Sequence, residues 1–305
     1  MPNRKSALIV LSVGKFMRVL IIGGSHFFGK RLVQKLIDAG DDVTVLTRGN
    51  RPINFNGDYK TLKGDRTNSL ELQSLVKDLN FDCIFDQACF DYPSAIASCE
   101  IFADKTKHYI FTSSQSVYGP GKNIKEESFD PSHHTYEKVV LAEENYAEAK
   151  RQTEVAFQKK APFTTCFVRF PIVIGEDDQT GRFNWHLKRI AERKEIFFPN
   201  IDASISFIYA GDAAMALQKI AREEIKGSLN CCSPGPIKLR TMVEDFELFL
   251  GKKMRIAKSG NDTNYSPYGI KNDWYMDNTK AMNSGLSFMG PREVLKRSLE
   301  NLVQA

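Results

Sequence analysis

Short apolar runs of strand type alternate with helix-like segments through the first half of this 305-residue chain. The helix-like segment after the first run places Leu32, Val33, Leu36 and Ile37 on one face, and Gly40 is predicted to end it. Strands separated by helices of this length require βαβ crossovers, and therefore a parallel sheet with helices on both faces. We predict an α/β fold with strands at residues 18–23, 42–47, 59–64, 81–88, 108–114 and 164–170.

The alternating pattern loosens after Phe170, where aromatic residues and prolines interrupt the helix-like segments. We predict a cofactor domain at residues 17–169, to which residues 203–232 return. A smaller, interleaved substrate lobe is predicted at residues 170–202 and 233–305. Residues 1–16 are expected to be a disordered extension or a misassigned start, with the fold beginning near Met17.

Composition excludes several classes of function. The net charge is +5, but three lysines and arginines lie in the first sixteen residues, so the remainder carries about +2 and makes a nucleic-acid surface a weak hypothesis. The six cysteines have no C-x-x-C spacing, which favours a cytoplasmic protein with reduced thiols and no metal site. No apolar run approaches the roughly 18 residues that a membrane span needs.

A glycine-rich turn follows the first predicted strand and opens into the first predicted helix. Gly23 is expected to make the tight turn, and Gly29 to let the helix pack closely. The helix N-terminus would direct N–H groups at a pyrophosphate. Ser25, His26, Phe27 and Phe28 lie between the two glycines. His26 replaces a glycine of the usual motif, so its Cβ should push the cofactor outward or its ring should donate a hydrogen bond.

The second strand ends in Thr47 and Arg48, where NAD-binding Rossmann sites usually carry an acid. A missing carboxylate and a gained guanidinium, with Arg51 nearby, favour the 2′-phosphate of NADP over NAD, which stays possible. The alternative is that Arg48 is a solvated loop cation. Asp65 ends the third strand and could accept a hydrogen bond from the adenine amino group, or be an ordinary loop aspartate.

Ser114, Tyr146 and Lys150 are the predicted catalytic groups. Ser114 ends a strand, and Tyr146 and Lys150 lie four residues apart on a predicted helix, so they share a face. A lysine beside the phenol would favour the phenolate, and Tyr146 could then exchange a substrate hydroxyl proton. Ser114 would orient the same oxygen.

The order of these motifs resembles the extended short-chain dehydrogenase/reductase superfamily, particularly its NAD(P)-dependent sugar epimerase/dehydratase group. The resemblance covers most of residues 17–303 and also rests on the stretches "GDR", "FTSSQSVYG", "YAEAKRQTE" and "VRFPIVIG". It implies hydride transfer at a hydroxyl or keto carbon of a nucleotide-sugar. It adds Arg66, Ala88, Lys150, Phe170 and Pro171 to the expected cofactor contacts.

The bulky residue in the turn is similar to an atypical branch of the superfamily that includes the chloroplast stem-loop-binding proteins. Those relatives bind RNA and largely lack the Tyr/Lys pair, which this chain keeps. We therefore predict an epimerase or reductase. An RNA-binding or ribonucleolytic protein and a non-catalytic NADP sensor are the alternatives. Dehydratase chemistry is disfavoured, because Ser114, Gln115 and Ser116 stand where dehydratases of the family carry Thr-Asp-Glu.

Substrate contacts are predicted for Ser114, Ser116, Arg182, Asn184 and His186, with an amphipathic helix carrying buried aromatics as the alternative for the last three. Arg169 could lie by the nicotinamide or form a structural salt bridge. Asp212 is read as a helix N-cap. A homodimer is possible, since family members often pair through two helices.

Overall fold

The computed structural model describes residues 16–304, so the prediction for residues 1–16 falls almost wholly outside the described part. A seven-stranded sheet in the order β12-β7-β5-β4-β1-β2-β3 forms its centre, and all of its strand pairs are parallel. The strands are β1 (Arg18–Ile22), β2 (Asp42–Thr47), β3 (Lys60–Lys63), β4 (Cys83–Asp86), β5 (His108–Ser114), β7 (Thr164–Phe170) and β12 (Gly227–Asn230). The predicted parallel α/β fold is confirmed.

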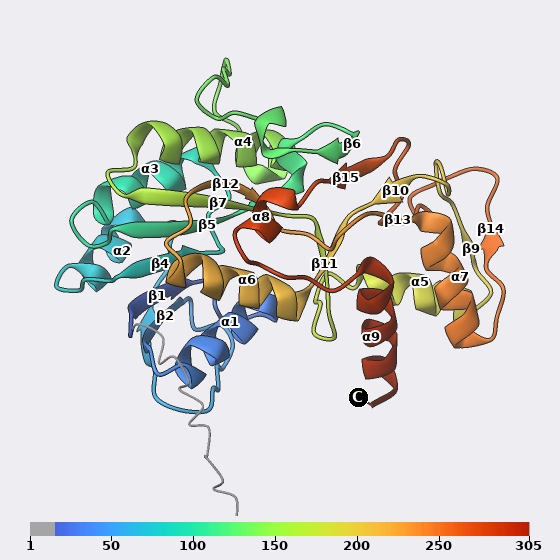
Figure 1. Cartoon of the computed structure of the whole chain (residues 1–305), viewed down its shortest axis with the longest axis horizontal. Helices are drawn as coiled ribbons and strands as arrows, with labels where there is room; N and C mark the ends of the chain where they lie inside the picture. Colours follow the sequence, from blue (N-terminus) through green and yellow to red (C-terminus); the bar gives the residue numbers. More distant parts are fainter. Residues whose placement is uncertain (1–15, 305) are drawn as a thin grey trace, which may run out of the picture.

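Helices cover both faces of this sheet (Figure 1). One face carries α1 (Phe27–Asp38) and α6 (Ala210–Arg222), and the other carries α2 (Ser69–Val76), α3 (Tyr92–Ile101) and α4 (Ala142–Lys160). The predicted apolar face of α1 is buried at Leu32, Val33 and Leu36, and Gly40 follows the helix with a φ of 80°. Each face therefore has its own apolar core between sheet and helices.

A second lobe packs around a third apolar core that includes Phe183, Phe207, Phe246 and Tyr268. Its helices are α5 (Arg182–Ala191), α7 (Leu239–Leu250) and α9 (Pro291–Gln304), and α8 (Thr279–Asn283) lies near β12. Its sheets are short: β13 (Ile237–Lys238), β10 (Ser204–Ile205), β15 (Trp274–Met276) and β6 (Gly121–Ile124) form one. The pairs β8 (Ile172–Ile174) with β11 (Phe207–Tyr209) and β9 (Glu195–Ile196) with β14 (Arg255–Ile256) form the others.

The two lobes exchange strands. Strand β12 follows second-lobe strands in the chain and yet forms an edge of the large sheet. In the other direction, residues 115–129, which we call the arm, carry β6 and the short 3₁₀ helices η1 (Gln115–Val117) and η2 (Glu126–Ser128). Because β6 pairs with β15, the arm joins the second lobe although it lies inside the predicted cofactor domain. The predicted domain boundaries stay a prediction.

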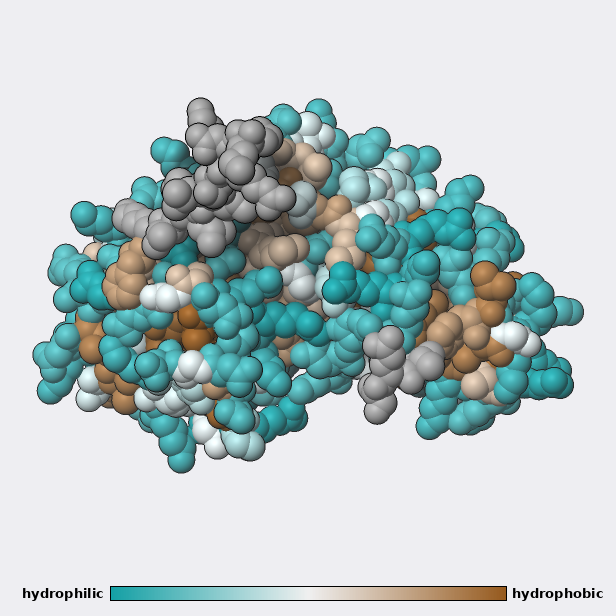
Figure 2. All heavy atoms as spheres, turned by 60° about the horizontal axis from the view of Figure 1, so that its bottom comes forward, coloured by the Kyte–Doolittle hydropathy of each residue, from teal (hydrophilic) through white to brown (hydrophobic). Residues whose placement is uncertain are grey.

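Two further predictions concern the cysteines and Asp212. All six cysteines are buried free thiols. Asp212 is not an N-cap, because α6 begins one turn earlier than expected, with Tyr209 as its N-cap; the Asp212 carboxylate instead accepts a hydrogen bond from Met289 N at 2.7 Å. Hydrophilic residues dominate the face seen in Figure 2, and apolar residues gather over α7 and α9, where Leu248 is 84% exposed.

Gly251 ends α7 in the left-handed region, with φ of 61°, and a Cβ there would meet nothing within 4 Å. The Gly251→Ala substitution should therefore lower the free energy of unfolding through backbone strain alone, by about 1 kcal/mol. Gly119→Ala is the matched control, because Gly119 also has open space but no positive φ. Urea unfolding of both variants checks this, and equal losses would contradict it.

Candidate active site

A cavity of about 560 Å³ opens at the carboxyl ends of β1 to β4. Strand β1 lies between β2 and β4 in the sheet. From β1 the chain adds β2 and β3 on one side and then β4 and β5 on the other, and doubly wound folds bind ligands at this reversal of strand order. The predicted residues that line the cavity are Gly23, Ser25, His26, Thr47, Arg48, Asp65, Arg66 and Ala88. The remaining lining residues include Arg51, Gln87 and Phe90, which the sequence analysis did not assign to the site.

The glycines of the turn meet close neighbours. Gly23 has a φ of 89°, which a side chain rarely adopts, and a Cβ at Gly29 would lie 2.9 Å from Gly23 O and clash with the Gln87 side chain. The first N–H groups of α1 have no acceptor within the helix and carry the positive end of its dipole. The turn therefore brings backbone donors to the cavity, which is what a pyrophosphate requires.

His26 is accommodated without blocking the turn. It is the N-cap of α1 in extended conformation, and its Nδ1 lies 2.6 Å from Ser25 Oγ. The strain appears one residue later, where Phe27 has a φ of 47°. The Phe27 ring lies where a Cβ on Gly175 would come within 3.0 Å, so a glycine beside α6 gives it room.

Cations line the cavity near the end of β2. Arg48 is exposed at its rim, and Arg51 lies close by and donates to Gln179 Oε1 at 2.7 Å. Thr47 Oγ1 accepts a hydrogen bond from Gly49 N at 3.3 Å. Hydrogen bonds from Thr67 lower the pKa of Asp65, so this carboxylate is anionic at neutral pH and could accept a further hydrogen bond.

Arg66 has a structural partner as well as a place at the cavity. Its side chain is buried, and Nη2 donates to Asp86 Oδ2 at 2.5 Å and to Ser98 Oγ at 2.9 Å. Tyr109 OH donates to the same Asp86 oxygen at 2.6 Å. This network fixes the end of β4 below the cavity.

The other predicted cofactor residues do not line this cavity. Phe27 and Phe28 pack against the core between the sheet and α1, and the rings of Phe28 and Phe170 are 5.5 Å apart. Pro171 is half-buried after β7. Gly29 lies beneath the turn, and because it has no side chain, Gly23 O and the Gln87 side chain can pack against it. Their contacts with a cofactor stay predictions.

The structure brings Ser114, Tyr146 and Lys150 together where β5 ends and α4 begins. Helix α4 is kinked at Asn145, which has non-helical φ and ψ of −155° and 94° and accepts from Glu148 N at 3.1 Å. Asn145 thus caps the long part of α4 and makes Tyr146 its first residue. A phenolate at this helix N-terminus is stabilised by the helix dipole.

Lys150 lies one turn further and is buried. Its Nζ donates to Cys89 O at 2.8 Å and to Thr112 O at 3.0 Å, and it lies 5.9 Å from the centre of the Tyr146 ring. The exposed Phe90 ring lies 4.7 Å from the same nitrogen. Burial lowers the pKa of Lys150 to about 8, so the group is charged at neutral pH at the expense of stability.

Ser114 and Arg182 both lower the pKa of the Tyr146 phenol. Burial raises the pKa of Tyr146 above its usual value, whereas a hydrogen bond with Ser114 and the charge of Arg182 lower it. The Ser114 hydroxyl also donates to Ser116 Oγ at 3.2 Å. The phenol therefore has a serine hydroxyl beside it, an arginine charge that lowers its pKa and a lysine nitrogen 5.9 Å from its ring centre, an arrangement suited to proton exchange with a bound hydroxyl or carbonyl.

Of the three predicted substrate residues on α5, only Arg182 carries a charge that lowers the pKa of this phenol, and its Nε donates to Thr180 Oγ1 at 3.0 Å. Asn184, two residues along the helix, lies on a different face of α5 and lines a crevice of about 10 Å³ beside α9. His186 is fully buried, with Nδ1 2.8 Å from Arg182 O and Nε2 2.8 Å from Ser266 Oγ. Both ring nitrogens of His186 thus have protein partners, which fits the alternative of a buried aromatic on an amphipathic helix. The substrate contacts of Asn184 and His186 stay predictions.

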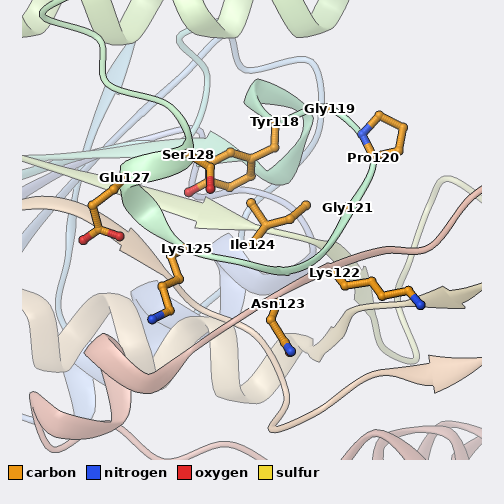
Figure 3. Close-up of a pocket in the computed structure, with 10 residues that line it drawn as sticks. All are labelled: Tyr118, Gly119, Pro120, Gly121, Lys122, Asn123, Ile124, Lys125, Glu127 and Ser128. Atoms are coloured by element: carbon orange, nitrogen blue, oxygen red, sulfur yellow. The ribbon is translucent and has the colours of Figure 1, made fainter.

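The arm curves around a second, open hollow of about 610 Å³ (Figure 3). Tyr118 and Ile124 point into the curve of the arm, while Lys122, Lys125 and Glu127 point outward. Lys122 pairs with Asp273 at 3.2 Å. The arm begins directly after Ser114 and includes Ser116, so it connects the end of β5 to the second lobe.

Four residues of this region were not predicted from the sequence: Arg51, Gln87, Phe90 and Asn145. Arg51 was noted only as a neighbour of Arg48. Gln87 and Phe90 flank Ala88, and their proximity to a predicted contact was the available signal. Asn145 directly precedes Tyr146, and asparagine is a frequent N-cap, but an unbroken helical pattern concealed the kink.

A sequence model of the "NAD dependent epimerase/dehydratase family" matches residues 19–232. The chain belongs to this family. Among curated proteins it is 26% identical, over 72% of its own length, to "Chloroplast stem-loop binding protein of 41 kDa b, chloroplastic" from Arabidopsis thaliana, of which the match covers 59%. It is 24% identical, over 75% of its length and 89% of the relative, to "dTDP-6-deoxy-L-talose 4-dehydrogenase (NAD(+))" from Aggregatibacter actinomycetemcomitans.

A solved structure supports the same fold. The Bordetella bronchiseptica enzyme WbmG, solved in complex with NAD and UDP, superposes with a TM-score of 0.75 over 95% of each chain at 14% identity. Across residues 16–304, no helix is long and apolar enough to span a membrane. Within the same residues, His, Cys, Asp and Glu side chains form no cluster of three that could hold a metal ion.

The depressed pKa of Lys150 predicts a pH-dependent stability. Between pH 8 and 10.5 the unfolded lysine keeps its proton while the folded one loses it, so the free energy of unfolding rises with pH. The Lys150→Met variant lacks this gain. Its stability relative to wild type should therefore fall between pH 8 and 10, by up to about 1.4 kcal/mol per pH unit.

Urea unfolding at pH 7, 8, 9 and 10 measures this difference. Lys159→Met is the control, because Lys159 lies on the same helix and is exposed. The same pH profile in both variants would show that the burial of Lys150 does not control the effect.

Proposed function

We propose that this protein is an NAD(P)-dependent epimerase or reductase that transfers hydride at a hydroxyl or keto carbon of a nucleotide-sugar. The observation that carries the proposal is the grouping of Ser114, Tyr146 and Lys150 where β5 ends and the long part of α4 begins, with Lys150 Nζ 5.9 Å from the centre of the Tyr146 ring. The sugar-nucleotide names of two relatives, one acting on a dTDP-sugar and one holding UDP, support the substrate class.

The residues fit a dinucleotide. The turn provides backbone donors and close approach at Gly23 and Gly29, where a Cβ would fill the space, and the cavity of about 560 Å³ is lined by Arg48 and Arg51. When bound, the nicotinamide accepts a hydride and can return it. The part of Asp65 would be to accept from the adenine, and that of the α1 N-terminus to hold the pyrophosphate.

The protein groups then manage the proton. Tyr146 accepts the proton of the substrate hydroxyl as the C–H bond breaks, with Ser114 holding the oxygen and Lys150 favouring the phenolate. With the ketone held by the same groups, the site would serve either inversion of that centre or a simple oxidation. Elimination lacks a carboxylate next to Ser114, because Gln115 occupies that place and donates to Trp274 O at 2.8 Å.

NADP is the preferred cofactor in this proposal, because Arg48 and Arg51 supply two guanidinium groups and no carboxylate ends β2.

The similarity to a chloroplast stem-loop-binding protein supports the second candidate, RNA binding on the same scaffold. A cytoplasmic location and a homodimer stay predictions.

Calorimetric titration of nucleotide-free protein with NADPH and NADH tests the cofactor. Arg48→Ala should weaken NADPH binding by about tenfold or more and leave NADH binding unchanged, since a hydrogen bond to a charged group contributes about 1.5–3 kcal/mol. Arg18→Ala is the control, because Arg18 is exposed and pairs with Asp82 instead. Failure of wild type to bind either nucleotide, together with binding of an RNA stem-loop, would favour the second candidate.

Tyr146→Phe separates binding from chemistry. The variant should bind the dinucleotide as wild type does, yet lose about 10²- to 10⁴-fold in turnover of a nucleotide-sugar, because the general base is gone. A panel of UDP- and dTDP-sugars, followed by exchange of label between solvent, cofactor and substrate, provides the assay. Undiminished turnover in Tyr146→Phe would refute the assigned role of the phenol.

A further inference from the structure

A buried ion pair lies directly behind the groups of the candidate active site. Glu154 and Arg169 are both 0% exposed, and Arg169 Nη2 lies 2.5 Å from Glu154 Oε2 while Nε lies 3.0 Å from Oε1. This forked geometry fixes the two side chains relative to each other. The function proposed above assigns the pair no chemical step, since neither side chain reaches the Tyr146 phenol.

Each partner of the pair belongs to an element that carries part of the site. Glu154 is four residues after Lys150 and lies one turn further along α4. Arg169 is the neighbour of Phe170 at the end of β7. Ser113, the neighbour of Ser114, donates from Oγ to Glu154 Oε1 at 2.5 Å. One carboxylate therefore joins the ends of β5 and β7 to the helix of Tyr146 and Lys150.

The arginine extends the same connection to the arm. Its Nη1 donates to Tyr118 OH at 2.7 Å and to Glu126 O at 2.9 Å, and Nη2 donates to Phe129 O at 3.1 Å. With the two bonds to Glu154, all five N–H donors of Arg169 have acceptors. Tyr118 in turn donates to Asn230 Oδ1 at 2.8 Å, so β12 is tied to the same group.

We propose that Glu154 and Arg169 form a positioning pair, which sets the placement of Ser114, of the Tyr146–Lys150 helix and of the arm relative to one another. The inference rests on the proposed function, since it concerns the same phenol. A lysine at position 169 would keep the charge but lose the planar fork and most arm contacts. Glutamine at position 154 would keep the size and lose the charge. In both variants Ser114 should lose its alignment with Tyr146.

The titration of Tyr146 reports this alignment without a known substrate. We expect Arg169→Lys, Glu154→Gln and Ser113→Ala each to raise the pKa of Tyr146 by about one unit, as loss of a hydrogen bond to the phenolate does. The pKa is measured from the ultraviolet difference between each variant and the same variant carrying Tyr146→Phe. Ser114→Ala, which removes the hydrogen bond directly, sets the size of the effect. Once a substrate is assayed, kcat should fall by about 10²-fold with little change in KM.

The control is Arg222→Lys. Arg222 pairs with the buried Asp41 at 2.5 Å before β2 begins, so this variant disturbs a comparable ion pair at the opposite end of the sheet. It should lower the melting temperature and leave the Tyr146 titration unchanged. Should Arg169→Lys and Glu154→Gln fail to fold, Ser113→Ala decides, because it removes a single hydrogen bond.

The outcomes separate the inference from the function on which it rests. If Ser114→Ala raises the pKa of Tyr146 and the three variants of the pair do not, the positioning role is overturned and the proposed function stands. If Ser114→Ala also leaves the pKa of Tyr146 unchanged, Ser114 and the phenol are not aligned, and both the positioning role and the proposed function are overturned. If the variants of the pair match Ser114→Ala while Arg222→Lys does not, the pair positions the site.

Discussion

The constraint on which this site depends is the direction of a parallel sheet. All seven strands of the large sheet run the same way, so their carboxyl ends meet at one edge, where loops can present polar groups without burying them. The cavity residues follow β1 to β4, and Ser114 and Phe170 end β5 and β7. The glycine-rich turn and the pair of Tyr146 and Lys150 thereby lie at the same edge of the sheet, although more than 100 residues separate them in the chain.

The polar groups at this edge include buried charged side chains, and burying them lowers the stability of the fold. Lys150, Arg66 with Asp86, and Arg169 with Glu154 all lie within the protein, and the pKa of Lys150 falls to about 8 because water is excluded. Removing one partner from such a pair typically costs about 3–5 kcal/mol, since the other charge is left unpaired. The two ion pairs therefore contribute less to net stability than to a fixed geometry, which a set of reacting groups needs.

Sequence periodicity was sufficient for the elements and for residues tied to them by local rules. The strands, the buried face of α1, and the grouping of Tyr146 with Lys150 all follow from spacing along the chain. The partners of His186 could not be predicted in this way because they depend on tertiary packing: Ser266, eighty residues later, supplies the partner of its Nε2. The Asn145 kink and the joining of the arm to β15 depend likewise on contacts that no local pattern records.

The turn at His26 shows how a departure from a motif is compensated elsewhere. A glycine in the usual position lets the backbone adopt unusual angles; here the left-handed residue is Phe27, at a cost of about 1–2 kcal/mol. That cost is offset only if the ring finds a place, and it does so against Gly175, where a side chain would collide with both Phe27 and Ala210. The variant turn and the segment after β8 thus depend on each other. A bulky residue at position 175 would therefore disturb the glycine-rich turn, although the two segments lie far apart in the sequence.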